Sequence, residues 1–290
     1  GKITVGLAPA DAASVSHNSF SSFSVSANGV DLDNGTAKAS LIVNEVTSTR
    51  PTMIGGPLTV IGPKADVIIA NPNGIAVNGG KFLNTGNVVL TTGTIGRDAG
   101  GRITTSVSAG KIEIGEGGLS GAMEELALIS GALSISGALS YDLSSARSHV
   151  NMITGTSTSS FDRSRGGLDA DGEAQLPWAM AVTGGSAAAP DAIIVDITES
   201  GSISAGRISV TVTGEGAGVR FAGDQLASAG GFRLSGTGRL DLTGGKIRAR
   251  DGVAISTEEA RFSSERGQRA EIVSDVSGVV VEATRGSIDL

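Results

Sequence analysis

The sequence predicts an all-β fold, a parallel β-helix in which each coil of the chain stacks on the coil before it. Three observations predict it. Short stretches of three to six residues alternate apolar and polar side chains, as β-strands do. Glycine makes up 44 of the 290 residues, about twice its ordinary share, and supplies tight turns. Similar units begin near Ile203, Leu226, Ile247 and Ile272, and their spacing of 23, 21 and 25 residues is typical of stacked repeats.

The composition excludes several classes of protein. The charges sum to 22 − 29 = −7, so the chain lacks the basic excess that a nucleic-acid-binding protein needs for phosphate contacts. Hydrophobic residues are 39% of the chain, too many for a disordered protein, and aromatic residues are 3%, so aliphatic side chains must form the core. Cysteine is absent, which excludes disulfides and cysteine metal sites. No apolar run approaches the length of about 18 residues that suggests a membrane-spanning helix.

The chain divides into three predicted regions. Residues 1–30 are expected to form an N-terminal β cap, because the first coil of a solenoid otherwise exposes an unpaired strand edge. Phe20 and Phe23 lie there in a serine-rich alternation. Residues 31–200 are expected to form the main β-helix domain, and residues 201–290 the first coils of a more regular repeat.

Strands are expected from the alternating stretches. Residues 124–129 have some helical character, but the Ser130-Gly131 that follows favours a strand. Further strands are expected at 103–107, 111–114, 207–212, 218–221, 239–242 and 253–255. At about 22 residues per coil, the chain would form about 12–13 coils in a rod about 60 Å long.

Two parts of the chain depart from this pattern. Residues 157–191 are rich in Gly, Ala, Ser and Asp and carry Pro177, Pro190 and the single tryptophan, Trp178. This segment is expected to form loops or a hairpin outside the helix. The sequence begins without methionine and its last residues, 286–290, form a strand pattern without a cap, so we expect a piece of a longer protein.

The tetrapeptide Asn71-Pro72-Asn73-Gly74 lies between two apolar runs, at 67–70 and 75–77. Asparagine at the first position bonds the backbone, proline presets φ at the second, and glycine closes the turn. On residue types alone, the tetrapeptide predicts a tight type I turn between two buried strands.

An ordered set of motifs spans residues 14–95. It consists of Ser16-His-Asn-Ser-Phe20, Ile42-Val-Asn-Glu-Val-Thr47, Val67-Ile-Ile-Ala-Asn-Pro-Asn-Gly-Ile75, Asn78-Gly-Gly80, Phe82-Leu-Asn-Thr85 and Leu90-Thr-Thr-Gly93. The set closely resembles the secretion domain of two-partner secretion exoproteins, the filamentous-haemagglutinin-like family. Ala205-Gly-Arg-Ile208 and Gly218-Val-Arg220 resemble the start of the family's haemagglutinin repeats.

This resemblance implies a right-handed parallel β-helix with an N-terminal cap and extra-helical elements. It implies a non-enzymatic N-terminal secretion domain of a large exported adhesin or toxin-delivery exoprotein. The periplasmic POTRA domains of an Omp85-type outer-membrane transporter would recognise the domain, which would nucleate β-helix folding at the surface of a Gram-negative cell. No cofactor, nucleic acid or membrane insertion is implied, the domain is expected to be a monomer, and the missing C-terminal part would bind any receptor on a host or neighbouring cell.

The resemblance also implies which residues act in transporter recognition or folding. They are Ser16, His17, Asn18, Asn44, Glu45, Asn71, Pro72, Asn73, Gly74 and Asn84. The family's Asn-Pro-Asn-Leu motif before the Asn-Glu-Val stretch is missing here, where residues 33–38 are shorter. Its absence argues against a recognition mechanism that needs two Asn-Pro motifs.

Two other functions stay open. Parallel β-helices also host carbohydrate-active enzymes, and the carboxylate pairs Asp31/Asp33 and Asp169/Asp171 could each share a strand face, although such residues more often serve in turns. The other alternative is an autonomous adhesive module that binds a host glycan or a haem-carrying protein.

Further chemistry has weaker signals. His17 and His149 are the two histidines, and no G-x-S-x-G motif accompanies them as a nucleophile. The acidic residues Asp162, Asp169, Asp171 and Glu173 lack the spacing of a calcium loop and favour a solvated loop. The glycine-rich stretches 115–118 and 214–218 do not complete a nucleotide-binding motif.

Overall fold

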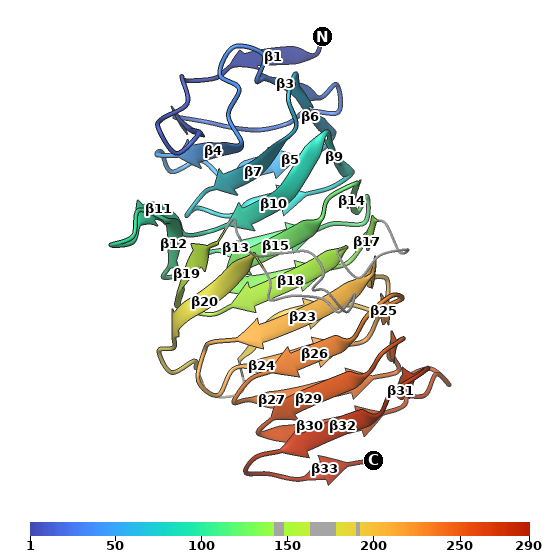
Figure 1. Cartoon of the computed structure of the whole chain (residues 1–290). Coiled ribbons are helices and arrows are strands. Elements are labelled where there is room, and N and C mark those ends of the chain that lie inside the picture. Colours follow the sequence, from blue (N-terminus) through green and yellow to red (C-terminus); the bar gives the residue numbers. More distant parts are fainter. Residues whose placement is uncertain (142–147, 163–177, 190–191) are drawn as a thin grey trace.

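The computed structural model describes residues 1–141, 148–162, 178–189 and 192–290, and it confirms the predicted all-β parallel solenoid (Figure 1). Across these residues the secondary structure consists of strands, bridges and turns, and no helix is long and apolar enough to cross a membrane. Each described coil contributes strands, in order, to parallel sheets that we name A, B and C, except that the first coil has no strand in sheet C. The coils stack from the N-terminus at one end to the C-terminus at the other (Figure 1).

The strands of the three sheets follow the order of the coils. In the described residues, sheet A contains β1 (Ile3–Gly6), β3 (Val30–Asp33), β6 (Pro57–Ile61), β9 (Gly80–Leu83), β14 (Leu119–Gly121), β17 (Ala138–Tyr141), β22 (Ser202–Ala205), β25 (Asp224–Ala227), β28 (Lys246–Ala249) and β31 (Glu271–Ser274). Sheet B contains β2 (Val15–Phe20), β4 (Leu41–Val46), β7 (Ala65–Ala70), β10 (Thr85–Thr91), β15 (Glu125–Ser130), β18 (His149–Thr154), β23 (Arg207–Val212), β26 (Phe232–Ser235), β29 (Val253–Thr257) and β32 (Val279–Ala283). Sheet C contains β5 (Thr52–Ile54), β8 (Ile75–Val77), β13 (Lys111–Ile114), β16 (Ala132–Ile135), β21 (Ile193–Ile197), β24 (Gly218–Phe221), β27 (Arg239–Thr243), β30 (Glu259–Ser263) and β33 (Ile288–Asp289).

The number of coils is smaller than the sequence predicted. Sheets A and B each hold ten strands in the described part of the chain, so the expectation of about 12–13 coils is wrong. The physical reason is that strands β11, β12, β19 and β20 belong to a separate sheet and add no coil. Nine intervals of about 4.8 Å make the stack about 43 Å long instead of 60 Å.

A fourth, antiparallel sheet, D, lies outside the coils and projects to the left in Figure 1. Among the described residues it consists of β11 (Thr94–Arg97), β12 (Ile103–Val107), β19 (Ser157–Phe161) and β20 (Ala179–Gly184). β12 pairs with β19, so excursions from two different coils join into one sheet. An extra-helical hairpin was expected near 157–191, and β19 and β20 are antiparallel partners there; Pro177 and Pro190 lie outside the described residues. The strand expected at 103–107 exists, but it leaves the coil.

Two apolar cores hold the molecule together. The main core fills the coils with residues from the inward positions of all three sheets, such as Ile208 and Val210 of β23. A second core lies between the outer face of sheet B and sheet D, where Trp178 and Phe161 pack with ring centroids 5.0 Å apart. Because both faces are covered, all six residues of β15 and of β18 are buried.

The repeat register differs by one residue from the prediction. Ile203 pairs with Gln225, and Gln225 pairs with Ile247, so the inward position in β25 is Gln225 instead of Leu226. Gln225 is 2% exposed and its Nε2 donates to the carbonyl of Gly223. Hydrophobicity pointed to Leu226, but the alternation of the strand places that side chain outward.

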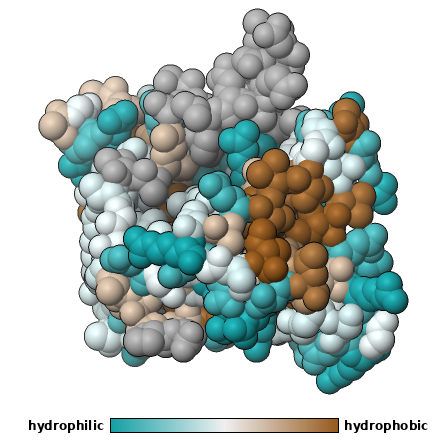
Figure 2. All heavy atoms as spheres, turned by 90° about the horizontal axis from the view of Figure 1, so that it is seen from below, coloured by the Kyte–Doolittle hydropathy of each residue, from teal (hydrophilic) through white to brown (hydrophobic). Residues whose placement is uncertain are grey.

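The two ends of the stack differ. β1 and β2 pair in parallel with β3 and β4, so residues 1–30 add a coil to sheets A and B, and the division at residues 30 and 200 stays a prediction. At the C-terminal end, apolar side chains form a patch that is seen when the molecule is viewed along the stack from that end (Figure 2). The exposed large apolar residues of the last coil include Val276, Val279, Val280 and Ile288.

Candidate functional site

Ser16 and Asn18 lie on β2 at inward positions of the first coil, opposite Ile42 and Asn44 of β4. The Ser16 Oγ donates to the carbonyl of Ala8 at 2.8 Å, and the Asn18 Oδ1 accepts from the Ala8 backbone N–H at 2.8 Å. The Asn18 Nδ2 also donates to the Val43 carbonyl at 3.2 Å. These two side chains therefore fasten the preceding loop to the first two coils.

Asn44 lies on the same inward column, between Asn18 of β2 and Ile69 of β7. Its side chain is 0% exposed. Among the described residues, neither its Nδ2 nor its Oδ1 has a hydrogen-bond partner. Asn44 is thus a buried side-chain amide without a hydrogen bond in the described part of the chain.

His17 and Glu45 lie on the outward face of the same two strands. The His17 Nε2 and the Glu45 Oε2 are 2.9 Å apart, and the Glu45 Oε1 accepts from the backbone N–H of Ile95 at 3.2 Å. Ile95 belongs to β11, the edge strand of sheet D. The Arg97 guanidinium of β11 also pairs with Asp11 at 2.7 Å. Glu45 therefore caps the free edge of sheet D and docks it onto the first coils.

Asn71 forms the corner between β7 and β8. Its side chain is buried, its Nδ2 donates to the Arg50 carbonyl at 2.8 Å and to the Thr52 Oγ1 at 3.0 Å, and its Oδ1 accepts from the Asn73 backbone N–H at 3.0 Å. The Gly74 N–H donates to the Asn71 carbonyl at 3.1 Å, the bond that closes a β-turn. The predicted tight corner is confirmed.

The corner also holds the coil before it. The Asn73 Nδ2 donates to the Ser48 carbonyl at 2.6 Å, so Asn71 and Asn73 together bind the loop of residues 47–51. Gly74 has a φ of +106°, a conformation that favours glycine. Pro72 at the second position of the turn fits the geometry that proline presets.

Asn84 lies at a different corner, between β9 and β10. It has a φ of +56°, and its Nδ2 donates to the carbonyls of Val60 at 2.8 Å and Gly62 at 3.1 Å in the preceding coil. Asn34 follows β3 in the same way and is fully buried, with its Nδ2 donating to the carbonyls of Ala39 and Pro63.

Sequence reasoning missed the role of Asn34. The signal that could have found it is position: Asn34, Asn71, Asn78 and Asn84 each come directly after a strand. An amide at that position can satisfy backbone groups of a neighbouring coil.

The ten predicted residues therefore lie in four places. Ser16, Asn18 and Asn44 lie on the inward face of sheet B, His17 and Glu45 lie on its outward face, and Asn71–Gly74 and Asn84 occupy two separate corners. They do not form one surface. A partner that reads all of them in a single contact would have to meet the chain before it folds.

Sequence reasoning also missed a buried polar network on the outer face of sheet B. Glu125 accepts from the backbone N–H groups of Trp178 at 2.8 Å and Ala179 at 3.1 Å, and from the Asn151 Nδ2 at 3.0 Å. Its Oε2 lies 3.5 Å from the His149 Nδ1. The network anchors β20, and its sequence signal is weak because the partners are up to 54 residues apart.

The electrostatics of this pair follow from burial. Desolvation lowers the pKa of His149, and the nearby Arg207 guanidinium lowers it further, against the opposing effect of Glu125. Desolvation alone would raise the pKa of Glu125, but the hydrogen bonds and charge of its neighbours outweigh it and lower that pKa below its usual value. Glu125 is therefore an ionised carboxylate whose charge is held by three N–H donors.

The carboxylate pairs considered for catalysis have local partners. Asp31 forms an ion pair with Lys2, and the Asp33 Oδ1 accepts from the Gly35 N–H at 2.9 Å in a turn. Asp169, Asp171 and Glu173 lie outside the described residues. Within the described residues, no group of three or more His, Cys, Asp or Glu side chains could hold a metal ion.

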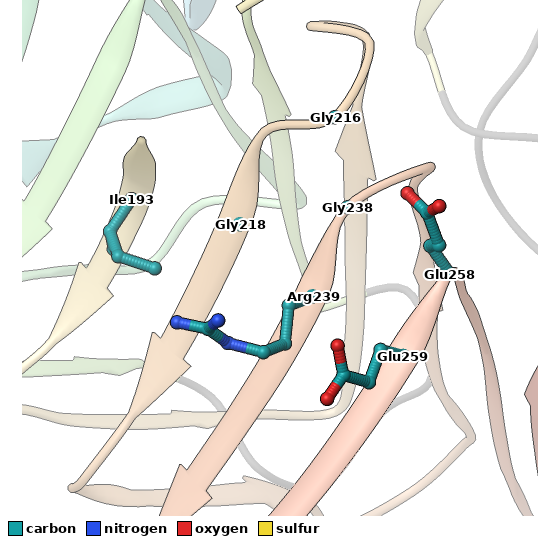
Figure 3. A pocket seen from close by; sticks show the side chains of 7 residues that line it. All are labelled: Ile193, Gly216, Gly218, Gly238, Arg239, Glu258 and Glu259. Atoms are coloured by element: carbon teal, nitrogen blue, oxygen red, sulfur yellow. The ribbon is translucent and has the colours of Figure 1, made fainter. Parts of the chain in front are cut away.

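Hollows occur on the surface of the described residues. One, of about 230 Å³, lies on sheet C, where Gly218 and Gly238 leave room beside Arg239, Glu258 and Glu259 (Figure 3). Arg239 pairs with Asp241 at 3.0 Å, and Glu259 pairs with Arg261 at 2.9 Å.

Another hollow, of about 470 Å³, adjoins Pro72 at the end of sheet D. Serine and threonine residues make up most of its lining. They are Thr92, Thr94, Ser106, Ser108, Thr156, Ser157, Thr158, Thr183 and Ser186.

Comparison with known proteins points to secretion. A family model described as the TPS secretion domain matches residues 2–242. The filamentous hemagglutinin of Bordetella pertussis is 31% identical over 257 residues, which cover 82% of this chain and 7% of that protein. The tRNA nuclease CdiA of Yersinia mollaretii is 30% identical over 261 residues, covering 82% of this chain and 8% of that protein. The chain thus spans less than a tenth of the length of these relatives.

Solved structures agree with the fold. The crystal structure of the filamentous hemagglutinin secretion domain has a TM-score of 0.73 and 26% identity, and the match covers 98% of this chain and 92% of that one. The HMW1 secretion domain from Haemophilus influenzae has a TM-score of 0.59 and 16% identity, with 95% and 76% coverage, and supports the fold alone.

Proposed function

The chain belongs to the TPS secretion domain family, and we propose that the periplasmic POTRA domains of an Omp85-type transporter recognise it for export. Secretion domains of this family work with an outer-membrane transporter, and the filamentous hemagglutinin and CdiA relatives are exported proteins of Gram-negative bacteria. The role of the family is secretion and is not enzymatic. In our proposal, the chain crosses the periplasm unfolded and folds at the cell surface.

The observation that carries this proposal is the parallel stacking of the described coils, each on the one before it, together with the family match over residues 2–242. Parallel pairing between distant residues forms slowly, which keeps the chain unfolded long enough for a transporter to engage it. Once β1 to β4 are paired, each later coil has a preformed edge to add to. Folding outside the cell would then oppose backward movement of the chain.

The activity of the whole protein is a separate proposal. Because the chain covers less than a tenth of its relatives, we propose that it serves an adhesin or a toxin-delivery exoprotein whose activity, and any receptor on a host or neighbouring cell, belong to the rest of the protein. The carbohydrate-active alternative gains no support from Asp31 and Asp33, which have local structural partners.

The test is export of the 290-residue chain from a Gram-negative host that also expresses the transporter encoded beside its gene. We expect the chain in the medium with the intact transporter. With a transporter that lacks its periplasmic domains, we expect the chain to stay in the periplasm. Equal export by both transporters would contradict recognition by those domains.

A further inference from the structure

We infer that the transporter recognises Asn44 in the unfolded chain and that Asn44 is a specificity-determining residue of export. The reason is that its side-chain amide makes no hydrogen bond in the folded molecule. This inference rests on the proposed function. It goes further by separating, within the predicted site, a residue that serves recognition from residues that serve the fold.

The folded molecule makes Asn44 inaccessible. The side chain is 0% exposed and points into the coil, on the same inward face of β4 as Ile42 and Val46. The backbone of β4 is paired with β2 on one side and β7 on the other, so neither edge of the strand is free. A partner protein can therefore contact this amide only before the second coil closes.

The folded molecule is also weakened by Asn44. A buried amide without a hydrogen-bond partner loses its bonds to water and gains none. Neither polar atom of Asn44 has a partner among the described residues, and the main core surrounds its strand. An apolar residue of the same shape would be expected to make the fold more stable.

Other asparagines of the predicted site provide the contrast. Asn71 and Asn73 bind the loop of residues 47–51, and Asn84 binds the carbonyls of Val60 and Gly62. Each of these amides has a structural task, so its loss would disturb folding whether or not a partner reads it. The Asn44 amide makes no such hydrogen bond. An effect of its substitution on export would therefore indicate a loss of recognition by the transporter.

The chemistry of Asn44 suits recognition of an extended chain. Its amide offers two donors and an acceptor, and in an extended strand it projects on the side opposite Glu45. Partners that add a strand read alternate side chains in this way while the backbone supplies affinity.

The experiment compares Asn44→Leu with the wild-type chain and with Ile42→Leu, a matched change two residues away on the same strand and the same inward face. Two quantities are measured on each. The first is the unfolding equilibrium constant from urea denaturation. The second is binding of the urea-unfolded chain, diluted into buffer, to the isolated periplasmic domains of the transporter encoded beside the gene, with export by the co-expression assay alongside.

We expect the unfolding constant of Asn44→Leu to fall about fivefold or more relative to wild type, because an unsatisfied buried amide is removed. We expect its binding to the periplasmic domains and its export to fall about tenfold, as for loss of a specific contact at an interface, while Ile42→Leu keeps both. Binding is measured on the unfolded chain, so it remains informative even if a variant fails to fold.

Two results would overturn the inference. One is a less stable Asn44→Leu chain, which would give the amide a task in the fold. The other is undiminished binding and export of Asn44→Leu. If the wild-type chain itself neither binds the periplasmic domains nor is exported, the proposed function fails, and the inference fails with it.

Discussion

At the scale of single residues, the buried polar side chains divide into those that fasten the coils and those that do not. The side-chain amides of Asn71 and Asn84 donate hydrogen bonds to backbone carbonyls of the adjacent coil. They take the place of backbone N–H donors, which are missing at a corner. Glu125 does the same for β20 by accepting from two consecutive backbone N–H groups. In a solenoid with few aromatic residues, such amides and carboxylates set the register of the coils while aliphatic side chains supply the burial.

The Glu125–His149 pair predicts that stability falls with acid. The pKa of His149 is below its usual value of 6.5 in the folded chain, so near and below that pH the unfolded chain takes up a proton that the folded chain does not. The pKa of Glu125 is also lowered from its usual value of 4.5. The free energy of unfolding therefore falls further as the pH drops below 4.5. Each coupled proton lowers the free energy of unfolding by up to about 1.4 kcal/mol per pH unit.

The measurement is urea denaturation between pH 7.5 and 5. His149→Gln should show a flatter dependence on pH than wild type, because the buried imidazole is removed. A wild-type slope in His149→Gln would mean that this histidine is not buried in its neutral form.

At the scale of elements, sheet D is the feature that distinguishes this solenoid from a simple stack. It joins excursions from the coils of β10 and β18 and covers β15, whose residues are all buried as a result. Its edge strand, β11, is not left open, because Glu45 and Asp11 of the first coils hold it. Capping an edge with a carboxylate is one way in which proteins avoid unwanted strand pairing.

Glu45→Ala should therefore loosen β11 without unfolding the coils. We expect faster trypsin cleavage after Arg97 and Arg102, which flank the turn between β11 and β12, and an unfolding free energy within about 1 kcal/mol of wild type. The readout is the cleavage rate with the fragments identified by mass. Glu113→Ala removes an exposed carboxylate that pairs with Lys111 on sheet C and should leave the rate unchanged; equal rates for both variants would contradict the docking role of Glu45.

A feature of this molecule could be predicted from the sequence where the interacting residues lie close together in the chain, and not where they lie far apart. The corner at Asn71–Gly74 and the strand at 124–129 were predictable, because turn chemistry and alternation act over a few residues. The pairing of β12 with β19 was not, since it joins residues at least 50 positions apart through backbone bonds that need no particular side chain. Gln225 was misplaced because hydrophobicity favoured its neighbour, whereas the parallel register imposed by Ile203 and Ile247 decides which side chain faces inward.

At the scale of the whole molecule, the stack is close to one-dimensional, because in sheets A, B and C each described coil pairs only with the coils directly before and after it, and sheet D is the exception. Local stability should then vary along the axis. Coils in the middle have two neighbours, and those of β15 and β18 are also covered by sheet D. Coils at the ends have one neighbour, and β1, β32 and β33 are largely exposed.

This gradient predicts the pattern of amide hydrogen exchange. Peptides that contain β15 and β18 should exchange about a hundredfold more slowly than those that contain β1 or β32, because the middle opens only when neighbouring coils open as well. Trp178→Ala should speed exchange in β15 and β18, whose outer faces lose their cover, and leave β26 and β29 as in wild type. If all coils exchanged at one rate, the chain would unfold as a single unit, and the first coils could not act as a separate template for the rest.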